Sequence, residues 1–394
     1  MRYAHHRLRR AMAIIIGIVF LVSGLLKIED PVGTMLIITE YAKFFHIGFI
    51  IPAAKVLGII LATFEASLGI ALITGIMRKL AAVLTYALIG FFTIITFILW
   101  VKNPAMDCGC FGEAIHLTHG QSLVKNLILL ALALIAFTPF QNFGVPKLGK
   151  KVAAEIAFVS VLFGVMYSNT HLPPVDFTAF DWGAELFASL DESAMESGAE
   201  LKYVYQKDGV MESFALADIP AEPGWEFVEV DTSAVTAVNR ADNYPILGFR
   251  NAEGEYADSI AAEGKVVVFS VYDPGKAHWD RLQRQYHQAE EAGARPLLLV
   301  ASYPEEVDRF DIPIDLEIFY ADYKTLITLN RSNGGGAFFS EGELVNKWPS
   351  RDFPKHLEAY FEDDPVRLST HYIVKRRIRV QGFCVYLAAL LILL

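Results

Sequence analysis

Residues 11–28 read AMAIIIGIVFLVSGLLKI and carry a single charge, on Lys27. A helix of about 20 apolar residues is long enough to cross the hydrocarbon core of a bilayer, which is about 30 Å thick. The run is preceded by four basic residues: Arg2, Arg7, Arg9 and Arg10. This pattern predicts a first membrane span whose N-terminal end stays on the side that holds the basic residues.

Four more apolar runs follow, near residues 50–75, 81–101, 123–139 and 152–168. Hydrophobic residues make up 54% of the chain and charged residues 20%, and the mean hydropathy of +0.36 is too high for a purely soluble protein. We therefore predict an α-helical membrane bundle of four to five spans. Residues 1–145 hold the first four, and residues 146–171 form a linking fifth span.

Basic residues also predict how the bundle is oriented. The clusters at residues 2–10, 78–79 and 147–151 fall on one side if the spans alternate, and the positive-inside rule makes that side cytoplasmic. The expected location is a bacterial inner membrane, with a cytoplasmic N-terminus and a periplasmic soluble domain. A cleaved secretory signal is the alternative for the first run, but no small-x-small cleavage site follows it.

Between the first two spans, residues 33–49 are too polar to cross the membrane and hold several aromatic side chains. We predict an amphipathic helix that lies on the outer membrane face.

Two cysteines, Cys108 and Cys110, lie in the outward loop between the third and fourth spans. Thiols one residue apart in an oxidising compartment can close into a strained disulfide, and strained disulfides are readily exchanged. Three alternatives stay open: a static disulfide, two free thiols, or a zinc site completed by His116 and His119, since two Cys and two His can bind zinc tetrahedrally.

A buried carboxyl is predicted at Glu65, the one acidic residue within the second span. An ionisable group at such depth indicates a functional site. Counting about 1.5 Å per residue from Ile50 places Glu65 more than halfway through the span, so Lys27, read as a snorkelling interface residue, is a poor partner by depth. Hydroxyl groups of the third span are the expected donors instead: Thr85, Tyr86, Thr93 and Thr96. The alternative is a neutral carboxyl bonded to such a hydroxyl.

In their order and spacing, these motifs resemble DoxX-like membrane proteins and, within them, the methylamine-utilisation MauE branch. The matching stretches are FLVSGLLKIEDP at 20–31, Glu65 with LGIAL at 68–72, CGCFGE at 108–113 and SLVKNL at 122–127. The resemblance covers residues 10–140. It implies a small helical bundle of the inner membrane that is associated with periplasmic thiol redox or with maturation of a redox enzyme.

The remaining sequence is soluble in character and acidic. Residues 172–370 hold 16 Lys and Arg against 37 Asp and Glu, whereas residues 1–171 hold 14 against 7. This charge excludes nucleic acid as a partner. Short strands are expected in residues 172–263, at 201–206, 225–230 and 246–249.

From residue 264 to 370, the order strand, helix, strand, helix, hairpin is similar to the thioredoxin-like fold. Strands are predicted at 265–272 and 296–301, helices at 276–292 and 322–330, and a hairpin that turns at Glu341-Gly342. The turn after the first strand, where a thioredoxin needs two thiols, reads DPGKAH and has no cysteine. His278 in this turn is expected to be a solvated residue at the helix start.

The last segment, residues 371–394, is a basic stretch followed by a predicted apolar helix: KRRIR at 375–379 precedes the apolar residues 380–394, which include Cys384. This segment is a short sixth span or a helix on the outer membrane face, and both readings stay open.

The function predicted from these features is a redox-associated membrane protein. Cys108 and Cys110 would pass electrons between a periplasmic or membrane protein partner and an acceptor in the lipid bilayer, with quinone the candidate, and Glu65 would relay a proton. The rival is a non-enzymatic scaffold that docks a partner through its periplasmic domain. A transporter is a third reading, but the chain lacks the two matched discontinuous repeats that are typical of transporters.

Overall fold

The chain divides into two units in this computed structural model, which describes residues 2–104, 106, 108–138, 146–184, 186, 202–207, 210–215, 226–231, 245–310, 312–313, 315–361 and 365–394. Unit 1 comprises Met1–Phe177 and Arg376–Leu394, and unit 2 comprises Thr178–Lys375. Each is described by itself below.

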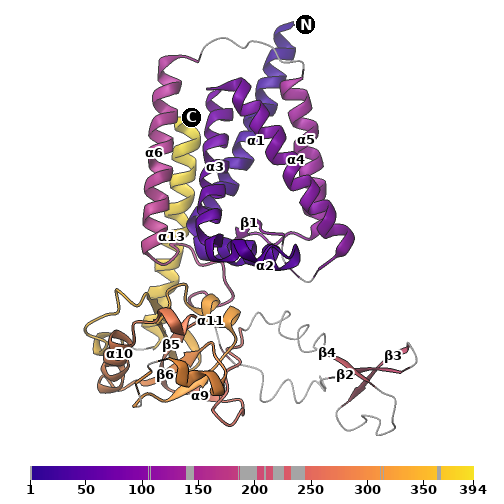
Figure 1. Ribbon diagram of the computed structural model, residues 1–394. Coiled ribbons are helices and arrows are strands. Elements are labelled where there is room, and N and C mark those ends of the chain that lie inside the picture. Colours follow the sequence, from indigo (N-terminus) through magenta and orange to yellow (C-terminus); the bar gives the residue numbers. More distant parts are fainter. Residues whose placement is uncertain are drawn as a thin grey trace. The chain divides into compact units, whose positions relative to one another are not determined.

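Unit 1 is a bundle of long helices (Figure 1). Its chain order is α1 (Arg2–Glu29), α2 (Pro31–Phe44), a 3-10 turn (Gly48–Ala53), α3 (Ala54–Thr74), α4 (Arg78–Lys102), strand β1 (Cys110–Glu113), α5 (His119–Phe137) and α6 (Leu148–Thr170). Among the residues that the structure describes, five helical segments are long and apolar enough to cross a membrane, which agrees with the five predicted spans: His6–Glu29, Gly48–Thr74, Arg78–Lys102, His119–Phe137 and Leu148–Thr170.

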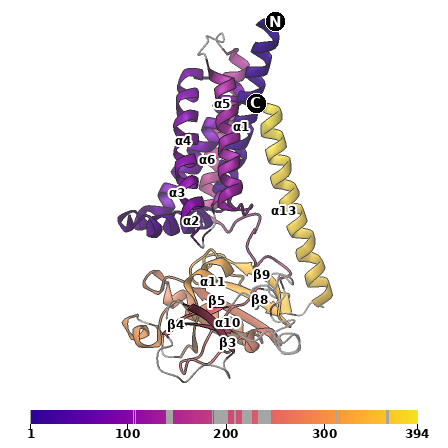
Figure 2. The same cartoon turned by 90° about the vertical axis from the view of Figure 1, so that its right-hand side faces the viewer.

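Helix α2 lies across one end of the bundle, as Figures 1 and 2 show from two sides. Its start follows from local chemistry, since Asp30 is the N-cap and accepts a hydrogen bond from the Gly33 N–H at 2.9 Å, while Pro31 lacks the N–H that a first helical residue leaves unpaired. The helix predicted within residues 33–49 is therefore present, and its place on a membrane face stays a prediction.

The backbones of helices α1 and α3 lie in close contact, because glycines of each helix face the backbone of the other helix. A Cβ on Gly24 would lie 2.5 Å from the nitrogen of Ala66, and one on Gly69 would lie 2.6 Å from the carbonyl oxygen of Gly17. Small residues at such crossings are typical of membrane helix pairs. The contact sets which turn of α1 lies beside which turn of α3.

We expect Gly24→Ala to lower the stability of the bundle by about 1–3 kcal/mol, because the added methyl group has no space and the backbones must separate. The measurement is the unfolding midpoint of the purified full chain in detergent. Gly90→Ala is the matched control, since a Cβ on Gly90 in α4 meets nothing within 4 Å and alanine favours a helix. Equal midpoints for the two variants would contradict the close packing.

The tail forms the end of α13 (Pro365–Leu393). Its last turns pack against unit 1, since Leu390 is buried in an apolar cluster with residues of α1, α3 and α6. The hydroxyl groups of Tyr386 and Ser160 on α6 lie 3.0 Å apart. Residues 380–394 therefore lie along the bundle, although α13 is not among the five segments that meet the criteria for a membrane span.

Unit 2 is an α/β unit built on a five-stranded mixed sheet with strand order β7-β6-β5-β8-β9. The strands are β5 (Lys265–Val271), β6 (Arg295–Val300), β7 (Ile318–Tyr320), β8 (Gly335–Ser340) and β9 (Glu343–Trp348). Strands β5, β6 and β7 are parallel to one another, whereas β8 is antiparallel to β5 and β9.

Both faces of this sheet are covered, so successive residues of β5 enter different cores. Val267 and Phe269 pack with Leu282 of α10 (Trp279–Glu291), and Val266 and Val268 pack with Leu326 of α11 (Tyr323–Leu329). The strands predicted at 265–272 and 296–301, the hairpin and the helix predicted at 322–330 are confirmed. The hairpin turns at Glu341 and Gly342 with positive φ at both, as a type I′ turn requires.

Three predictions for the soluble part need correction. Residues 246–249 form no strand, and only Arg250 makes isolated bridges, to Tyr256 and Tyr320. Strand β7 was not predicted, since three residues are too few for a periodic signal. Helix α10 begins at Trp279 rather than at 276, because Pro274–Lys276 forms a separate 3-10 turn and His278 is the N-cap residue.

The remaining strands of unit 2 are β2 (Lys202–Lys207), β3 (Val210–Ala215) and β4 (Glu226–Asp231), which pair in the order β3-β2-β4. They agree with the strands predicted at 201–206 and 225–230. Short α12 (Glu358–Phe361) precedes α13.

Candidate functional site

The two sulfur atoms of Cys108 and Cys110 lie 3.3 Å apart as free thiols. Gly109 between them has φ +60°, a backbone conformation that glycine adopts without strain and that folds the two side chains toward each other. Cys108 is 4% exposed, and Cys110 is partly exposed. The sequence motif therefore forms a compact dithiol in which Cys110 is the more exposed of the two residues.

The dithiol loop is fixed to the bundle by hydrogen bonds to its backbone. The Tyr41 hydroxyl of α2 donates to the Cys108 carbonyl, and the Ser23 hydroxyl of α1 lies 2.8 Å from the Cys110 carbonyl oxygen. Since both donors lie on helices, the loop has a defined position relative to the interior of the bundle.

Directly beneath the loop, Lys27 of α1 and Glu65 of α3 form a buried ion pair. The Lys27 Nζ lies 2.7 and 2.9 Å from the two carboxylate oxygens, and the residues are 5% and 1% exposed. The Ser23 hydroxyl lies 2.7 Å from a Glu65 oxygen and 3.0 Å from the Lys27 Nζ. Ser23 thus connects the ion pair to the backbone of Cys110.

The expectation that Lys27 is too far from Glu65 in depth was wrong. The α-helix of this span begins at Ala54, after the 3-10 turn Gly48–Ala53, but a count along one span does not show which turn of α1 lies beside Glu65. The contact of Gly24 with Ala62 and Ala66 puts Lys27 within one turn of Glu65. A helical side chain also leans toward the N-terminus of its helix, which brings the Lys27 ammonium to the level of Ser23.

The hydroxyl groups expected to bond Glu65 make other bonds. Thr85, Thr93 and Thr96 donate to carbonyls of their own helix at 2.7 Å, and the Tyr86 hydroxyl lies 3.0 Å from the Ala133 carbonyl. A threonine in a helix readily bonds the carbonyl one turn back, so its presence on the third span did not identify a partner for Glu65.

The surroundings of the two thiols differ in charge. The hydrogen bond from Cys108, followed by the Lys125 ammonium and the charge of Lys27, lowers the pKa of Cys110 to about 5 despite its burial. The same hydrogen bond and burial raise the pKa of Cys108. Cys110 is therefore the thiol that ionises, and a thiolate is the form that attacks a disulfide.

We expect Lys125→Met to slow alkylation of Cys110 by iodoacetamide near pH 6. A pKa of about 5 means that the thiolate is present above pH 5 and is lost as the pH falls through that value. Removing an adjacent cation raises a thiol pKa, by about one to three units for close charges, so the midpoint of the rate profile should move upward by at least about one unit. Peptide mapping measures the rate at Cys110.

Lys102→Met, at the exposed end of α4, is the control for this profile and should leave the midpoint unchanged. Superimposable profiles for Lys125→Met and the parent chain would contradict a role of Lys125 in thiolate stability.

A cavity of about 220 Å³ opens beside the dithiol and the ion pair. Both cysteines, Lys27 and Glu65 line it, together with mostly aliphatic and aromatic side chains such as Ile37, Phe92 and Leu129. Ser23, Tyr41, Lys125 and Asn126 add polar groups to its wall. An apolar cavity with a few convergent polar groups is the usual form of a small-molecule site.

The zinc alternative finds no support in the geometry. His119 bonds the Pro104 carbonyl through Nε2 at 3.1 Å. Within the described residues, no three His, Cys, Asp or Glu side chains gather closely enough to hold a metal ion, so Cys108, Cys110, His116 and His119 do not form one cluster.

Reasoning from the sequence missed the roles of Ser23, Tyr41 and Lys125. Ser23 and Lys27 are four residues apart and so share one helix face. This spacing could have indicated a polar site on α1. No comparable signal exists for Tyr41 or Lys125, since their places depend on how α2 and α5 pack.

Comparison with known proteins agrees with the resemblance found in the motifs. The family described as "Methylamine utilisation protein MauE" matches residues 6–139, the segment that contains every residue lining the cavity. Protein TlpB of Flavobacterium psychrophilum is 29% identical over 129 residues, which are 32% of this chain and 35% of that protein. The chain thus spans about a third of the length of this curated relative. No solved structure matches the chain.

Proposed function

We propose that the MauE-like bundle is a membrane redox protein in which Cys108 and Cys110 alternate between dithiol and disulfide. The observation that carries the proposal is the pair of sulfur atoms 3.3 Å apart at the wall of an apolar cavity. Only a small movement separates two thiols at this distance from a disulfide, whose S–S bond is about 2.05 Å long.

The chemistry balances with two thiols and one two-electron acceptor. Closing the disulfide breaks two S–H bonds, forms one S–S bond and releases two electrons and two protons. Oxidised Cys108 and Cys110 then accept two electrons from the thiol pair of a protein partner, whose cysteines become the disulfide. The partner's first thiolate attacks Cys110, the less buried of the two residues, which breaks the Cys108–Cys110 bond and frees the Cys108 thiol. The partner's second thiol then attacks the mixed disulfide, forms the partner's disulfide and frees Cys110.

The residues around the cavity fit a quinone as the electron acceptor. Its wall is mostly apolar, and the Asn126 amide, which gives one hydrogen to Thr96 at 3.2 Å, has a second N–H for a ring oxygen. A bound quinone would supply a two-electron oxidant that is soluble in the membrane. Lys27 and Glu65 hold a proton between them at the cavity wall, and Ser23 connects this proton to the dithiol loop.

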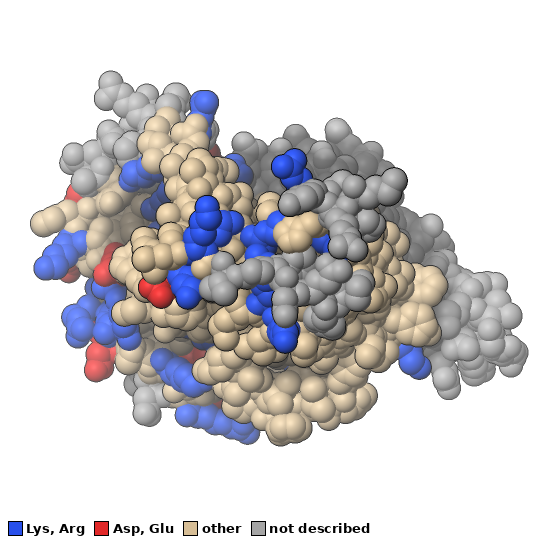
Figure 3. Space-filling model, turned by 90° about the horizontal axis from the view of Figure 1, so that it is seen from above, with Lys and Arg blue, Asp and Glu red and all other residues tan. Residues whose placement is uncertain are grey.

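The proposed location is a bacterial inner membrane with the dithiol on the periplasmic side. Basic residues support this orientation, since Arg10, Arg78 and Lys150 belong to the end of the bundle opposite α2 and β1. Figure 3 looks onto that end and shows Lys and Arg side chains spread over it.

The test is the thiol state of the full chain in membranes. Maleimide-polyethylene glycol labelling should show Cys108 and Cys110 shifting from mostly bridged under oxidising growth to mostly free after a partner dithiol is supplied, with Cys384 replaced by Ser to simplify the pattern. A pair that stays free, or stays bridged, under both conditions would contradict the proposal.

The second candidate function is a scaffold, and one feature of unit 2 favours it. A hollow of about 580 Å³ lies at the carboxyl ends of β6 and β7, lined by Tyr256, Tyr303, Tyr320 and Tyr323 together with Arg250. Tyrosine and arginine are enriched where proteins bind each other. The sheet order of unit 2 supports a thioredoxin-like assignment without the two thiols, which suits docking rather than redox chemistry.

Replacing both Cys108 and Cys110 by Ser distinguishes the two functions. A redox protein keeps its partner and loses partner oxidation, whereas a scaffold keeps both partner binding and function.

A further inference from the structure

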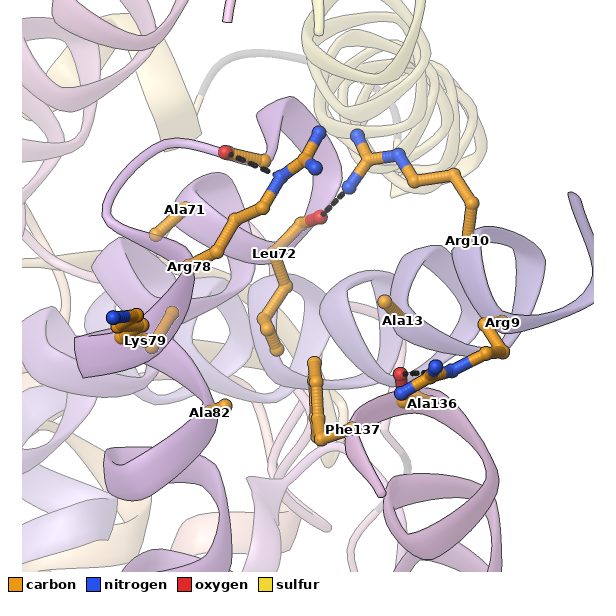
Figure 4. Close-up of a pocket in the computed structure, with 12 residues that line it drawn as sticks. Arg9, Arg10, Ala13, Ala71, Leu72, Arg78, Lys79, Ala82, Ala136 and Phe137 are labelled. Atoms are coloured by element: carbon orange, nitrogen blue, oxygen red, sulfur yellow. Dashed lines mark hydrogen bonds between the residues drawn. The ribbon is translucent and has the colours of Figure 1, made fainter. Parts of the chain in front are cut away.

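A second pocket lies at the basic end of the bundle, away from the dithiol. Four cationic side chains line it: Arg9 and Arg10 from α1, and Arg78 and Lys79 from α4. The rest of the lining is apolar and mostly small, with Leu72, Phe137 and several alanines (Figure 4). We call these four side chains the basic cluster.

Hydrogen bonds hold three of these side chains in place. The Arg9 Nε donates to the Ala136 carbonyl at 3.1 Å, the Arg10 Nη1 to Leu72 at 2.8 Å, and the Arg78 Nε to Gly75 at 3.0 Å. These carbonyls belong to the last turns of α3 and α5. The cations therefore have fixed positions, unlike the solvated lysines of a loop, and Arg9 is only 6% exposed.

The guanidinium groups of Arg10 and Arg78 lie near each other at the end of α3, and their side chains approach it from two sides in Figure 4. Nitrogen atoms of both lie 3.0 Å from the point where a Cβ on Gly75 would sit. Gly75 ends the helix with φ +79° and has no side chain, so both groups fit beside it.

Four positively charged side chains meet in this pocket, whose lining is otherwise apolar. The guanidinium groups of Arg9, Arg10 and Arg78 bond carbonyls at the ends of α3 and α5, where the helix dipole is negative. Among the described residues, the lining holds no Asp or Glu. The electrostatics therefore favour an anion beside the four cations.

The position and chemistry of the pocket select the kind of anion. The pocket lies where α3 and α5 end and α4 begins, which for membrane-spanning helices is the headgroup layer. Planar guanidinium groups match the oxygen atoms of a phosphate, and the apolar lining suits the start of an acyl chain. Basic pockets between membrane helices are known to hold anionic headgroups.

We propose that the basic cluster binds the phosphate group of an anionic phospholipid. The proposal does not depend on the redox function, because no residue of the basic cluster lines the cavity beside the dithiol.

Native mass spectrometry of the purified full chain tests it, with phosphatidylglycerol and phosphatidylcholine added in a neutral detergent. The expected result is at least tenfold more bound phosphatidylglycerol than phosphatidylcholine. The double variant Arg10→Gln/Arg78→Gln should lose this preference about tenfold. Lys79→Gln should reduce it about threefold, and because the Lys79 side chain is exposed, this variant keeps the fold even if the double variant does not.

Lys43→Gln, an exposed lysine on α2 at the other end of unit 1, is the matched control and should bind as the parent chain does. Inorganic phosphate is added in a parallel series. Displacement of phosphatidylglycerol by millimolar phosphate would assign the site to a soluble phosphate and overturn the lipid assignment. Equal binding of the two lipids, or an unchanged preference in both pocket variants, would overturn the proposal.

Discussion

Glu65→Ala is expected to destabilise the bundle by about 3–5 kcal/mol, the largest effect of any single substitution considered. The Lys27 ammonium is 5% exposed and has its two shortest bonds with the Glu65 carboxylate. Without that carboxylate, a buried charge would remain beside the ring of Phe92, 5.7 Å from its centroid. The unfolding midpoint of the full chain in detergent measures the loss.

Two further variants separate the effect of the unpaired buried charge on stability from the effect of the lost side-chain packing. Lys27→Met/Glu65→Leu removes both charges and should recover most of the stability, because a buried ion pair is often no more stabilising than apolar residues of similar size. Glu155→Ala, which removes an exposed carboxylate on α6, should have little effect. If Glu65→Ala and Glu155→Ala had equal midpoints, the buried ion pair would be refuted.

The double variant is also informative about function. If it is stable and yet fails to oxidise a partner dithiol, the ion pair is retained for proton handling beside the cavity. Normal partner oxidation by this variant would mean that Lys27 and Glu65 have no part in the redox cycle.

Cys110→Ser should reduce oxidation of a partner dithiol to the background rate, a loss of about 100-fold or more, because no Cys108–Cys110 disulfide can form to accept the two electrons. Cys108→Ser should have a different outcome. It also loses this oxidation, but its Cys110 thiolate can attack the partner in its disulfide form, which breaks the partner's S–S bond and gives a mixed disulfide that no Cys108 thiol resolves. Non-reducing electrophoresis should therefore show a stable adduct in Cys108→Ser alone.

Cys384→Ser is the matched control, since Cys384 lies on α13 and takes no part in the dithiol. It should retain full activity and form no adduct. Adducts of equal yield in Cys108→Ser and Cys110→Ser would contradict the assignment of Cys110 as the exchanging thiol, while leaving a redox role of the pair intact.

Much of the helical part could be predicted because each membrane span must satisfy its own backbone within one apolar run. The five spans were therefore readable from composition. The same reasoning failed for strand β7 and for residues 246–249, since short segments take their conformation from the sheet edge beside them rather than from their own pattern.

Some residues of the candidate site could likewise be predicted from the sequence, and others could not. Cys108, Cys110 and Glu65 stood out in the sequence as a dithiol and an intramembrane charge, and the geometry brings them to one cavity. Lys27 was set aside because depth was counted along single helices. Its pairing with Glu65 depends on the glycine contacts between α1 and α3, which no single helix encodes.

By itself, the amino-acid sequence determined that the described part of the chain has five helices long and apolar enough to cross a membrane, that two thiols lie one residue apart, and that an acidic α/β unit holds no thiol. These properties depend on composition and local order. Only the tertiary structure decided that Lys27 faces Glu65, that Ser23 and Tyr41 hold the dithiol loop, and that four cations converge on two helix ends. Such contacts depend on the register in which helices pack, and that register follows from side-chain fit between distant segments.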